Sequence, residues 1–418
     1  MADRALTEAD ALALDAADPL APYRRRFLLP VAPDGSNAIY LAGHSLGLQP
    51  RSVRDAIDAE LERWSRRGVD AWFEPDRPWF TCTERLREPM ARIVGARPSE
   101  VAILNALTVN IHLLLASFFR PVGRRRRILV DGPLFPSDRH ALTSHLVQRG
   151  LDPVRGLLVI EPRNGSPIVP TSDLEAAIRE HGAELALVFL AGVNFATGQL
   201  HEIRRLTAAA HESGAMVGWD LAHAAGNVEL SLHDWDVDFA AWCTYKYLNG
   251  GPGSVGAIFV HDRYGRDPST PRLGGWWGVD PDRRFDMVDA FVPASGAAGW
   301  EASTPPVMAL APLATSLAIF DEVGMPALRA KSVELTGYLA RLLDDLGIEA
   351  ITPTEPAARG AQLSLRLRDA ETVLAGLAAR GVVADFRAPD IIRVAPVPLY
   401  NTYHEAWRFA HLLREVGA

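Results

Sequence analysis

The sequence predicts an α/β fold, with a mostly parallel sheet in a large domain and a smaller α+β domain after it. The first observation is length: 418 residues, 48% of them hydrophobic, exceed one compact domain of ordinary size and can bury a sizeable core. The second is that short apolar runs alternate with helix-period segments from about residue 100 to 260, as in a parallel sheet covered on both faces. The third is a change of pattern after about residue 305.

The large domain contains candidate strands that are short apolar runs. They are residues 127–132, 156–162, 185–193, 215–220, 239–245 and 256–260. Helix-period segments lie between several of them; "TSDLEAAIREHG", for example, begins with a Thr/Ser cap and ends with a glycine. The apolar window 101–119 carries polar side chains throughout its interior, too many for the hydrocarbon of a membrane. We predict that this window is a buried helix.

The part of the chain after residue 305 predicts a small α+β domain. Residues 304–324 and 325–347 have the pattern of two long helices. Further strands are predicted at 361–367, 382–387 and 391–397, and further helices at 370–381 and 403–417. We therefore divide the chain into an N-terminal segment (1–49) that packs with the small domain, a large domain (50–305) and the small domain (306–418).

Composition limits the possible functions. The net charge of −8 gives no electrostatic basis for binding nucleic acid or an anionic membrane, and the run Arg124–Arg127 is typical of a solvated loop leading into a strand. The two cysteines, Cys82 and Cys243, exclude a disulfide framework and a Cys-rich zinc site. We expect no metal and a reducing cytoplasm. The N-terminus is acidic and lacks the basic start of a signal peptide.

The stretch "WDLAHAAGNVELSLHDWDVDFAAWCTYKYLNGGPG" carries an acid and an amine, Asp220 and Lys246, near the ends of two apolar runs. In open α/β sheets, ligands bind at the carboxyl ends of the strands. A lysine in a partly apolar pocket can form a Schiff base, and a buried carboxylate needs a cationic or donor partner. Pyridoxal phosphate (PLP) offers an aldehyde to the lysine and a pyridinium nitrogen to the aspartate. A Lys–Asp ion pair in the core would explain this pair equally well.

Two further motifs suit such a cofactor. "LNALTVNIHLLL" places Leu107 and Thr108 at a helix start, where free N–H groups and a hydroxyl can bind phosphate, although a simple N-cap has the same pattern. "GPLFPSDRHA" puts Phe135, Ser137 and Asp138 after a strand, so that an aromatic side chain could lie on a flat ring; a helix-starting turn is the alternative. The glycine-rich "NGGPGS" lacks the Walker pattern and indicates close backbone packing instead of nucleotide binding.

With these motifs in place, the sequence resembles the kynureninase family, PLP enzymes of the aspartate-aminotransferase fold (fold type I). The similarity runs from "YLAGHSLGLQP" at residue 40 to "IIRVAPVPLYNTYHEAWRF", and "LTVNIHLLL", "KYLNGGPG" and "RVAPVPLYN" in this order are specific to it. The resemblance implies a seven-stranded sheet, PLP as cofactor and a cytoplasmic homodimer with active sites at the interface. It also implies hydrolysis of L-kynurenine to anthranilate and L-alanine in tryptophan catabolism and NAD biosynthesis, with 3-hydroxykynurenine as a second substrate.

The resemblance also implies roles for single residues. Lys246 would form the Schiff base, Asp220 would hold the pyridine nitrogen protonated, and Tyr245 would be the acid–base partner. Arg393 would bind the substrate α-carboxylate as a bidentate fork, with Ser45 in support. Further cofactor contacts would come from Leu107, Thr108, Phe135, Ser137, Asp138 and His223, and from Trp276 and Thr304 of the neighbouring subunit.

Several positions depart from the family pattern. His44 stands where asparagine is usual, Ala191 where some members have serine, and Val279 where a histidine often lies. None of these three positions touches the Schiff base, so we expect the class of reaction to be the same as in the family. Trp72 and Thr304 stand where members favouring 3-hydroxykynurenine have histidine and asparagine. Because a ring hydroxyl loses its natural partners there, we predict a preference for L-kynurenine.

Three other functions were weighed against this one. A cysteine desulfurase needs a mobile cysteine well after the Schiff-base lysine, and none follows Cys243. A kynureninase-like enzyme of secondary metabolism, acting on a substituted kynurenine, stays open because of the departures above. A non-catalytic PLP-fold binding protein usually lacks the lysine, the acid or the arginine, and Lys246, Asp220 and Arg393 are all present.

Overall fold

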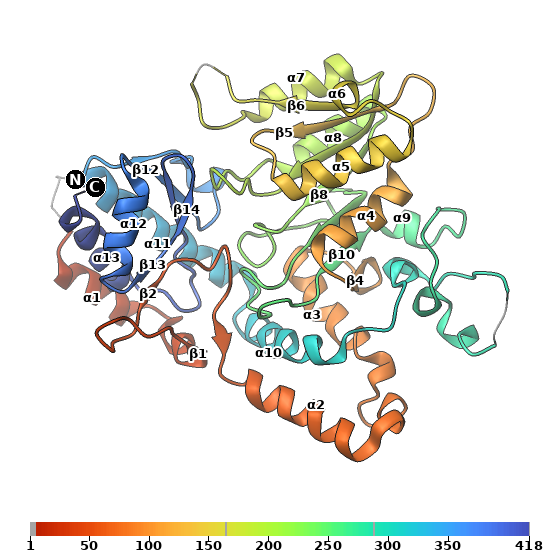
Figure 1. Cartoon of the computed structure of the whole chain (residues 1–418), viewed down its shortest axis with the longest axis horizontal. Coiled ribbons are helices and arrows are strands. Elements are labelled where there is room, and N and C mark those ends of the chain that lie inside the picture. The colour runs from red at the N-terminus through yellow and green to blue at the C-terminus, as the bar shows by residue number, and fades with distance from the viewer. Residues whose placement is uncertain (1–5, 164, 287–288, 418) are drawn as a thin grey trace.

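The large sheet is the centre of the structure (Figure 1). In this computed structural model, which describes residues 6–163, 165–286 and 289–417, seven strands have the order β4-β10-β9-β8-β7-β5-β6. Neighbours from β9 to β6 are parallel, and β10 runs antiparallel to β9 and β4. The strands are β4 (Val101–Ile103), β5 (Arg127–Asp131), β6 (Leu157–Ile160), β7 (Leu185–Ala191), β8 (Met216–Asp220), β9 (Phe239–Trp242) and β10 (Ala257–Val260). The prediction of a seven-stranded, mostly parallel sheet is confirmed.

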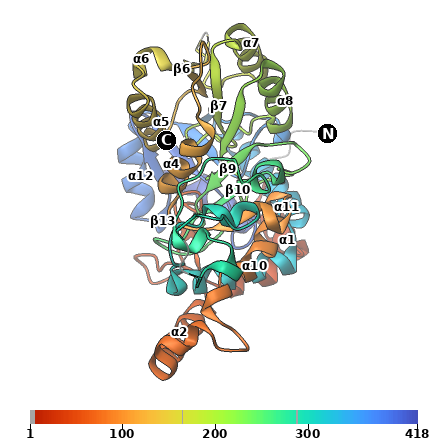
Figure 2. The same ribbon diagram turned by 90° about the vertical axis from the view of Figure 1, so that its right-hand side faces the viewer.

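Successive side chains of each strand pack into two different cores on opposite faces of the sheet, because side chains alternate along a strand. On β5, Leu129 packs into one core, whereas Ile128 and Val130 pack into the other. The first core is covered by α3 (Glu84–Val94), α7 (Thr171–His181), α8 (Ile203–Ser213) and α10 (Val307–Val323). The second is covered by α4 (Leu107–Phe118) and α5 (Pro136–Gln148). Figure 2 shows these layers from the side.

Three predicted elements were wrong. The strand predicted at 382–387 is two strands in different sheets, β13 (Val382–Val383) and β14 (Asp385–Arg387). Residues 101–119 are not one helix: Val101–Ile103 pair with β10 as the edge strand β4, and the helix α4 begins only at Leu107. The strand β9 ends at Trp242, so Lys246 lies in a loop and does not directly follow a strand. Beyond the end of β9, the Thr244 hydroxyl donates to the carbonyl of Val255, at 2.5 Å, just ahead of β10.

The small domain is built on a four-stranded antiparallel sheet of order β11-β12-β15-β14. Its strands are β11 (Glu349–Ala350), β12 (Leu363–Arg366), β14 (Asp385–Arg387) and β15 (Ile391–Val394), and its helices are α11 (Met325–Asp345), α12 (Ala370–Ala378) and α13 (Tyr403–Glu415). These elements share one core with a few N-terminal side chains, among them Ala11 and Ile39.

The N-terminal segment reaches both domains. Its helix α1 (Glu8–Ala17) lies against α13, and β2 (Ile39–Tyr40) pairs in parallel with β13 (Val382–Val383) of the small domain. The strands β1 (Phe27–Leu28) and β3 (Gln49–Pro50) pair antiparallel just before α2 (Val53–Arg67). This helix projects from the body in Figures 1 and 2. The domain limits at residues 49/50 and 305/306 stay predictions.

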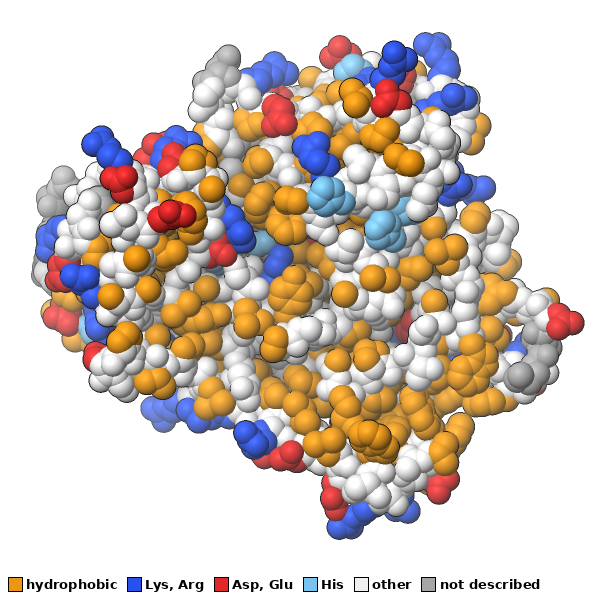
Figure 3. All heavy atoms as spheres, in the orientation of Figure 1, with side chains coloured by type: hydrophobic (Ala, Val, Ile, Leu, Met, Phe, Trp, Pro, Cys, Tyr) orange, Lys and Arg blue, Asp and Glu red, His pale blue; other side chains and the backbone are white. Residues whose placement is uncertain are grey.

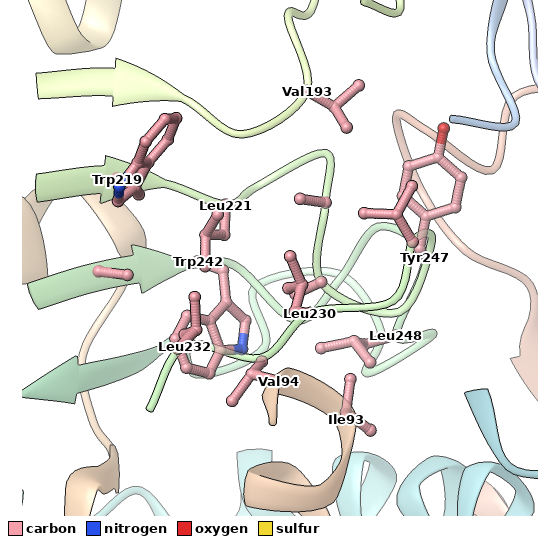
Figure 4. Close-up of a cluster of buried hydrophobic side chains, with 14 of the residues drawn as sticks. Ile93, Val94, Val193, Trp219, Leu221, Leu230, Leu232, Trp242, Tyr247 and Leu248 are labelled. Atoms are coloured by element: carbon pink, nitrogen blue, oxygen red, sulfur yellow. The ribbon is translucent and has the colours of Figure 1, made fainter. Parts of the chain in front are cut away.

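Two buried tryptophans fix the carboxyl ends of the central strands. Trp219 on β8 and Trp242 on β9 are both 0% exposed, and Figure 4 shows them within the cluster that includes Leu221 and Leu232. A buried indole contributes roughly 150–250 Å² of apolar surface to such a core. The position directly after Trp219, where β8 ends, is therefore held rigidly.

Among the described residues no single helix is long and apolar enough to cross a membrane. Only α10 and α11 together meet the length and composition required, and they are bent by 83° where they join.

Candidate active site

A cavity of about 220 Å³ opens at the carboxyl ends of the parallel strands. Its walls include the last residues of three strands, Asp131 of β5, Ala191 of β7 and Asp220 of β8. Most of the predicted cofactor-binding residues line it: Leu107, Thr108, Phe135, Ser137, Asp138, Asp220, His223, Tyr245 and Lys246.

Lys246 reaches the cavity from the loop after β9. Its Nζ lies 3.1 Å from Nε2 of His223 and 5.9 Å from the centre of the Tyr245 ring. Burial lowers the pKa of His223 well below 6.5, and the charges of Lys246 and Arg393 lower it further, so this imidazole is neutral. Because an ammonium only donates, His223 Nε2 accepts and its proton lies on Nδ1. Among the described residues His223 Nδ1 has no partner.

Asp220 faces Lys246 from the end of β8. One of its oxygens accepts the N–H of Ala222 at 2.7 Å, and its side chain also bonds that of Asp138. Burial raises the pKa of Asp138 well above 3.8, and the neighbouring Asp220 raises it further. Burial also raises the pKa of Asp220, although the charge of Lys246 acts against this shift. Asp138 is therefore the protonated donor, and Asp220 is the carboxylate that accepts from it.

The N-terminus of α4 presents free donors to the cavity. The helix begins at Leu107 after Ala106, whose side chain cannot cap it. The hydroxyls of Thr108 and Ser137 lie 2.6 Å apart, which joins the starts of α4 and α5. The N–H groups of a first helical turn, two hydroxyls and the positive end of a helix dipole are together suited to binding an anion.

Phe135 supplies the aromatic wall. It is 38% exposed and meets Phe195 edge to face, with ring centres 5.0 Å apart. An aromatic face left open beside a cavity is suited to stacking on a flat ligand ring.

Arg393 lies on β15 and reaches toward the large domain. Its Nη1 donates to the carbonyl of Phe195, a residue of the cavity wall, at 2.7 Å. On the other side the guanidinium is held by Asp385, with Nε and Nη2 at 2.9 and 2.8 Å from Oδ1. The Ser45 hydroxyl donates to Oδ2 of Asp385 at 2.8 Å and lies 3.4 Å from Arg393 Nη2.

The remaining predicted site residues lie outside this cavity. Trp72 packs against Trp79 and Trp277, with ring centres 5.6 and 5.7 Å away. Trp276 is 47% exposed and donates through Nε1 to the carbonyl of Arg284 at 2.9 Å. Thr304 is exposed at the rim of a separate small pocket beside Trp277. Within one chain these residues do not meet Lys246.

Two further acids, Asp131 and Asp385, belong to the site and were not predicted from the sequence. Asp131 is buried at the end of β5 and accepts from the Ala191 N–H at 3.0 Å, from Asn194 at 3.1 Å and from His201 at 3.2 Å. Burial alone would raise the pKa of Asp131, but the hydrogen bond and charge of His201 hold it below 3.8. The sequence did contain a signal for Asp131, because this acid directly follows the apolar run "RILV" and therefore lies at a strand end. No pattern in the sequence singled out Asp385.

One group of potential metal ligands lies away from the cavity. Glu100, His233 and His261 each offer a ligand atom within 4.8 Å of the others. The Glu100 carboxylate already accepts from His233 Nδ1 at 2.8 Å, from the Asp262 N–H at 2.9 Å and from the Arg97 N–H at 2.9 Å. These bonds tie together the segments before β4 and after β10, which is a structural role.

Comparison with known proteins gives one consistent family. Residues 328–413 match the family model for the kynureninase C-terminal domain. A kynureninase of Salinispora tropica is 51% identical over 411 residues, covering 96% of this chain and 95% of that protein. Kynureninases of Koribacter versatilis and Myxococcus xanthus are 49% and 48% identical, covering 96% and 97% of this chain and 96% of each protein.

Solved structures share the fold at lower identity. The apo cysteine desulfurase of Thermococcus onnurineus aligns with a TM-score of 0.74 at 20% identity, covering 90% of this chain and 94% of that chain. A C-DES mutant with glycine covalently linked to its PLP cofactor aligns with a TM-score of 0.76 at 18% identity, covering 93% and 98%. The predicted fold class, that of fold type I PLP enzymes, is confirmed.

Proposed function

The chain belongs to the kynureninase family, and on this premise we propose that it hydrolyses the Cβ–Cγ bond of L-kynurenine to give anthranilate and L-alanine. The observation that carries the proposal is 51% identity to a kynureninase over 96% of this chain. In the balanced reaction the hydroxyl of water ends on the aryl carbonyl carbon, and Cβ gains a proton. This reaction is a step of tryptophan catabolism.

The residues of the cavity fit PLP, the cofactor of this family. We assign the phosphate to the uncapped start of α4 with Thr108 and Ser137, and the ring to the open face of Phe135. The donors of α4 and Phe135 belong to one cavity with Asp220 and Lys246, which supports this assignment. When bound, PLP supplies an electrophilic carbon for amines and a ring that accepts electrons from the substrate α-carbon.

Lys246 is the Schiff-base residue in this proposal. The chain contains two lysines, and the other, Lys331, is buried in the small domain, where it pairs with Asp18 at 2.7 Å. Lys246 therefore has no competitor for the covalent role. When it is not bound to the cofactor, Nζ would be the base that takes the α-proton, and the neutral His223 at 3.1 Å would accept a hydrogen bond from its ammonium form.

Asp220 holds the pyridine nitrogen in its protonated state. Its carboxylate lies in the buried floor of the cavity, where a cationic partner stabilises it most strongly. Asp138, kept neutral by burial and by Asp220, donates a hydrogen bond that orients this carboxylate. The two acids thus differ in protonation state, because two hydrogen-bonded carboxyl groups do not both ionise. Together they hold the pyridine nitrogen.

Tyr245 is the proton donor of the hydrolytic stage. Burial raises the pKa of Tyr245 above 10, and the neighbouring Cys243 raises it further, so the phenol remains protonated at neutral pH. A protonated phenol at the wall of the cavity can donate to the carbonyl oxygen as water adds.

The α-carboxylate of the substrate binds Arg393. Of its five N–H groups, those directed at Asp385 and at the Phe195 carbonyl are used. One N–H of Nη1 and one of Nη2, the latter with only a 3.4 Å contact to Ser45, remain for a carboxylate. Ser45 supports this clamp through Asp385.

We propose that two chains form the working enzyme. Phe73, Phe285 and Trp276 are 61%, 55% and 47% exposed, and Phe285 lies 6.0 and 5.6 Å from the other two rings. Figure 3 shows apolar side chains gathered on the lower part of the molecular face that it draws, toward α2. Such exposed aromatic clusters mark protein interfaces. Trp72, Trp276 and Thr304, which lie outside the cavity of their own chain, would complete the site of the partner.

The cytoplasm is the proposed compartment, since both cysteines, Cys82 and Cys243, are buried and unpaired. A substituted kynurenine is the second candidate substrate, because His44, Ala191 and Val279 depart from the family pattern.

The experiment that tests the proposal is release of anthranilate, followed by its fluorescence, from PLP-loaded protein and L-kynurenine. We expect one L-alanine for each anthranilate. No release, with the absorbance band of lysine-bound PLP present, would favour a substituted kynurenine. Absence of both would contradict the PLP-enzyme proposal. Borohydride reduction followed by peptide mass analysis should find the label on Lys246 alone.

A further inference from the structure

His44 occupies a loop clamped between the two cationic residues of the site. On one side of the loop, Ala42 forms a parallel bridge with Ala395, two residues beyond Arg393. On the other side, the Gly47 N–H donates to the carbonyl of Tyr245 at 2.8 Å, next to Lys246. The loop between these anchors is a tight turn, in which Ser45 N–H donates to the Ala42 carbonyl at 2.9 Å. The chain thus holds His44 between the carboxylate clamp and the Schiff-base lysine.

The side chain of His44 is buried without a hydrogen bond. It is 0% exposed, and among the described residues neither Nδ1 nor Nε2 has a partner. Its closest ring neighbour in the site is His223, with centres 6.4 Å apart. Leaving a buried polar group unpaired is costly, and buried polar groups in proteins are hydrogen-bonded in the great majority of cases. His223 lines the cavity, so the two free nitrogens of His44 lie one ring away from it and are available to a ligand.

The charge around His44 decides which contact it makes. Burial lowers the pKa of His44 well below 6.5, and the positive charges of Arg393, Lys246 and Arg387 lower it further. The ring is neutral and keeps one N–H donor and one acceptor nitrogen. The positive charges near His44 favour an anionic ligand at this place. An anion that also binds Arg393 would reduce the repulsion between these charges, and the His44 N–H could donate to it.

We propose that His44 is a substrate-binding residue that donates a hydrogen bond to the α-carboxylate of the amino-acid substrate, beside Arg393. This inference rests on the proposed function, since it assigns the carboxylate to the Arg393 side of the cavity. It assigns to His44 a place at the amino-acid end of the substrate, not at its aryl end. The clamp would then consist of a charged fork from the small domain and a neutral donor from the N-terminal segment, and both would bind one carboxylate.

The test uses PLP-loaded protein and L-alanine, which has the ammonium and the carboxylate but no aryl group. Binding is followed by the absorbance change of the cofactor. His44→Phe keeps an aromatic ring and removes both nitrogens, and we expect it to weaken L-alanine binding about tenfold, as the loss of one hydrogen bond to a charged group requires. His44→Leu, a second apolar variant, should show the same loss. His44→Asn keeps a donor and should stay within about threefold of the wild type.

The matched control is Tyr338→Phe in the core of the small domain, which removes a buried hydroxyl that has no hydrogen-bond partner in the described part of the chain. It should leave L-alanine binding unchanged, which separates the site effect from a general effect of removing a buried polar atom. Unchanged L-alanine binding in both His44→Phe and His44→Leu overturns the inference. So does a loss that appears only with kynurenine, because His44 would then contact the aryl ketone. If wild-type protein binds L-alanine through His44 but does not cleave L-kynurenine, the proposed function fails and the inference stands.

Discussion

Asp385 and Arg393 lie directly opposite each other on the paired strands β14 and β15, and their side chains form a partly buried ion pair. Oδ1 of Asp385 lies 2.9 Å from Nε and 2.8 Å from Nη2, and the Arg393 side chain is 1% exposed. The antiparallel register, not a loop, therefore fixes the direction of the guanidinium. A buried arginine without this partner would be an uncompensated charge.

Removing the charge of Asp385 should weaken substrate binding strongly and lower the turnover rate only slightly. For Asp385→Asn we expect KM for L-kynurenine to rise about tenfold with a smaller change in kcat, because the fork loses its orientation. Steady-state kinetics measure the split. Binding of a kynurenine analogue without the carboxylate should not change. Arg387→Gln is the control, since Arg387 contacts the same carboxylate at 3.2 Å from the exposed side. An equal loss with the decarboxylated analogue would contradict the positioning role.

Lys246→Ala should abolish turnover while the fold is kept. We expect a loss of about a thousandfold or more, since both the covalent anchor and the base at the α-carbon are removed. The absorbance band of lysine-bound PLP should vanish as well. Lys331→Met is the comparison, because Lys331 is the other lysine of the chain and lies in the small domain. It removes a buried ion pair and should lower stability, but the absorbance band should persist. A surviving band in Lys246→Ala would mean that another group binds the aldehyde.

The pair Asp138–Asp220 predicts a pH-dependent stability of the cofactor-free protein. Burial and Asp220 raise the pKa of Asp138 above its unfolded value of 3.8, so its contribution to stability is fully present below 3.8 and is lost as pH rises through the folded pKa. Asp138→Asn keeps a donor toward Asp220 and does not ionise. The free energy of unfolding of the variant minus that of the wild type should therefore grow between the two pKa values, by up to about 1.4 kcal/mol per pH unit.

Urea unfolding of both proteins at several pH values measures this difference. A difference that stays constant with pH would show that Asp138 has an ordinary pKa. With PLP bound, the positive pyridine nitrogen should favour the ionised form of Asp220 and reduce the pH dependence.

Subunit complementation tests whether Trp276 acts across an interface. Lys246→Ala and Trp276→Ala chains, each of low activity alone, are mixed, unfolded and refolded together. If Trp276 serves the partner's cavity, half of the dimers are hybrids, and each hybrid has one intact site, so about a quarter of wild-type activity returns. No recovery would mean that Trp276 acts in its own chain or not at all. Light scattering of the wild type gives the mass of the assembly independently.

Most of the sheet and the floor of the site could be predicted from the sequence, because local patterns carry them. The run "MVGW" must be buried, so the acid that ends it, Asp220, had to lie at a strand end. The strand β4 was missed because its three residues continue directly into the apolar pattern of α4. The early end of β9 was missed because the buried run continues beyond Trp242, so the sequence pattern does not mark where the strand ends.

The contacts that position the substrate clamp could not be predicted in the same way. Asp385 could not be predicted because it meets Arg393 only through the cross-strand register of β14 and β15, which the sequence pattern does not reveal. His44 was noticed only as a departure from a family pattern. Its importance rests on complete burial without a partner, which is a property of the folded chain.

Substrate choice follows from the side chains outside the cavity. Trp72 packs against the rings of Trp79 and Trp277, and an indole has no acceptor nitrogen for a ring hydroxyl. We expect kcat/KM for L-kynurenine to exceed that for 3-hydroxykynurenine by about tenfold or more, because a hydroxyl in such surroundings loses its hydrogen bonds to water. The double variant Trp72→His, Thr304→Asn should reduce this ratio, whereas Phe80→Leu, at the edge of the same aromatic cluster, should leave it unchanged. If wild-type protein prefers 3-hydroxykynurenine, the aryl group binds elsewhere and neither Trp72 nor Thr304 selects the substrate.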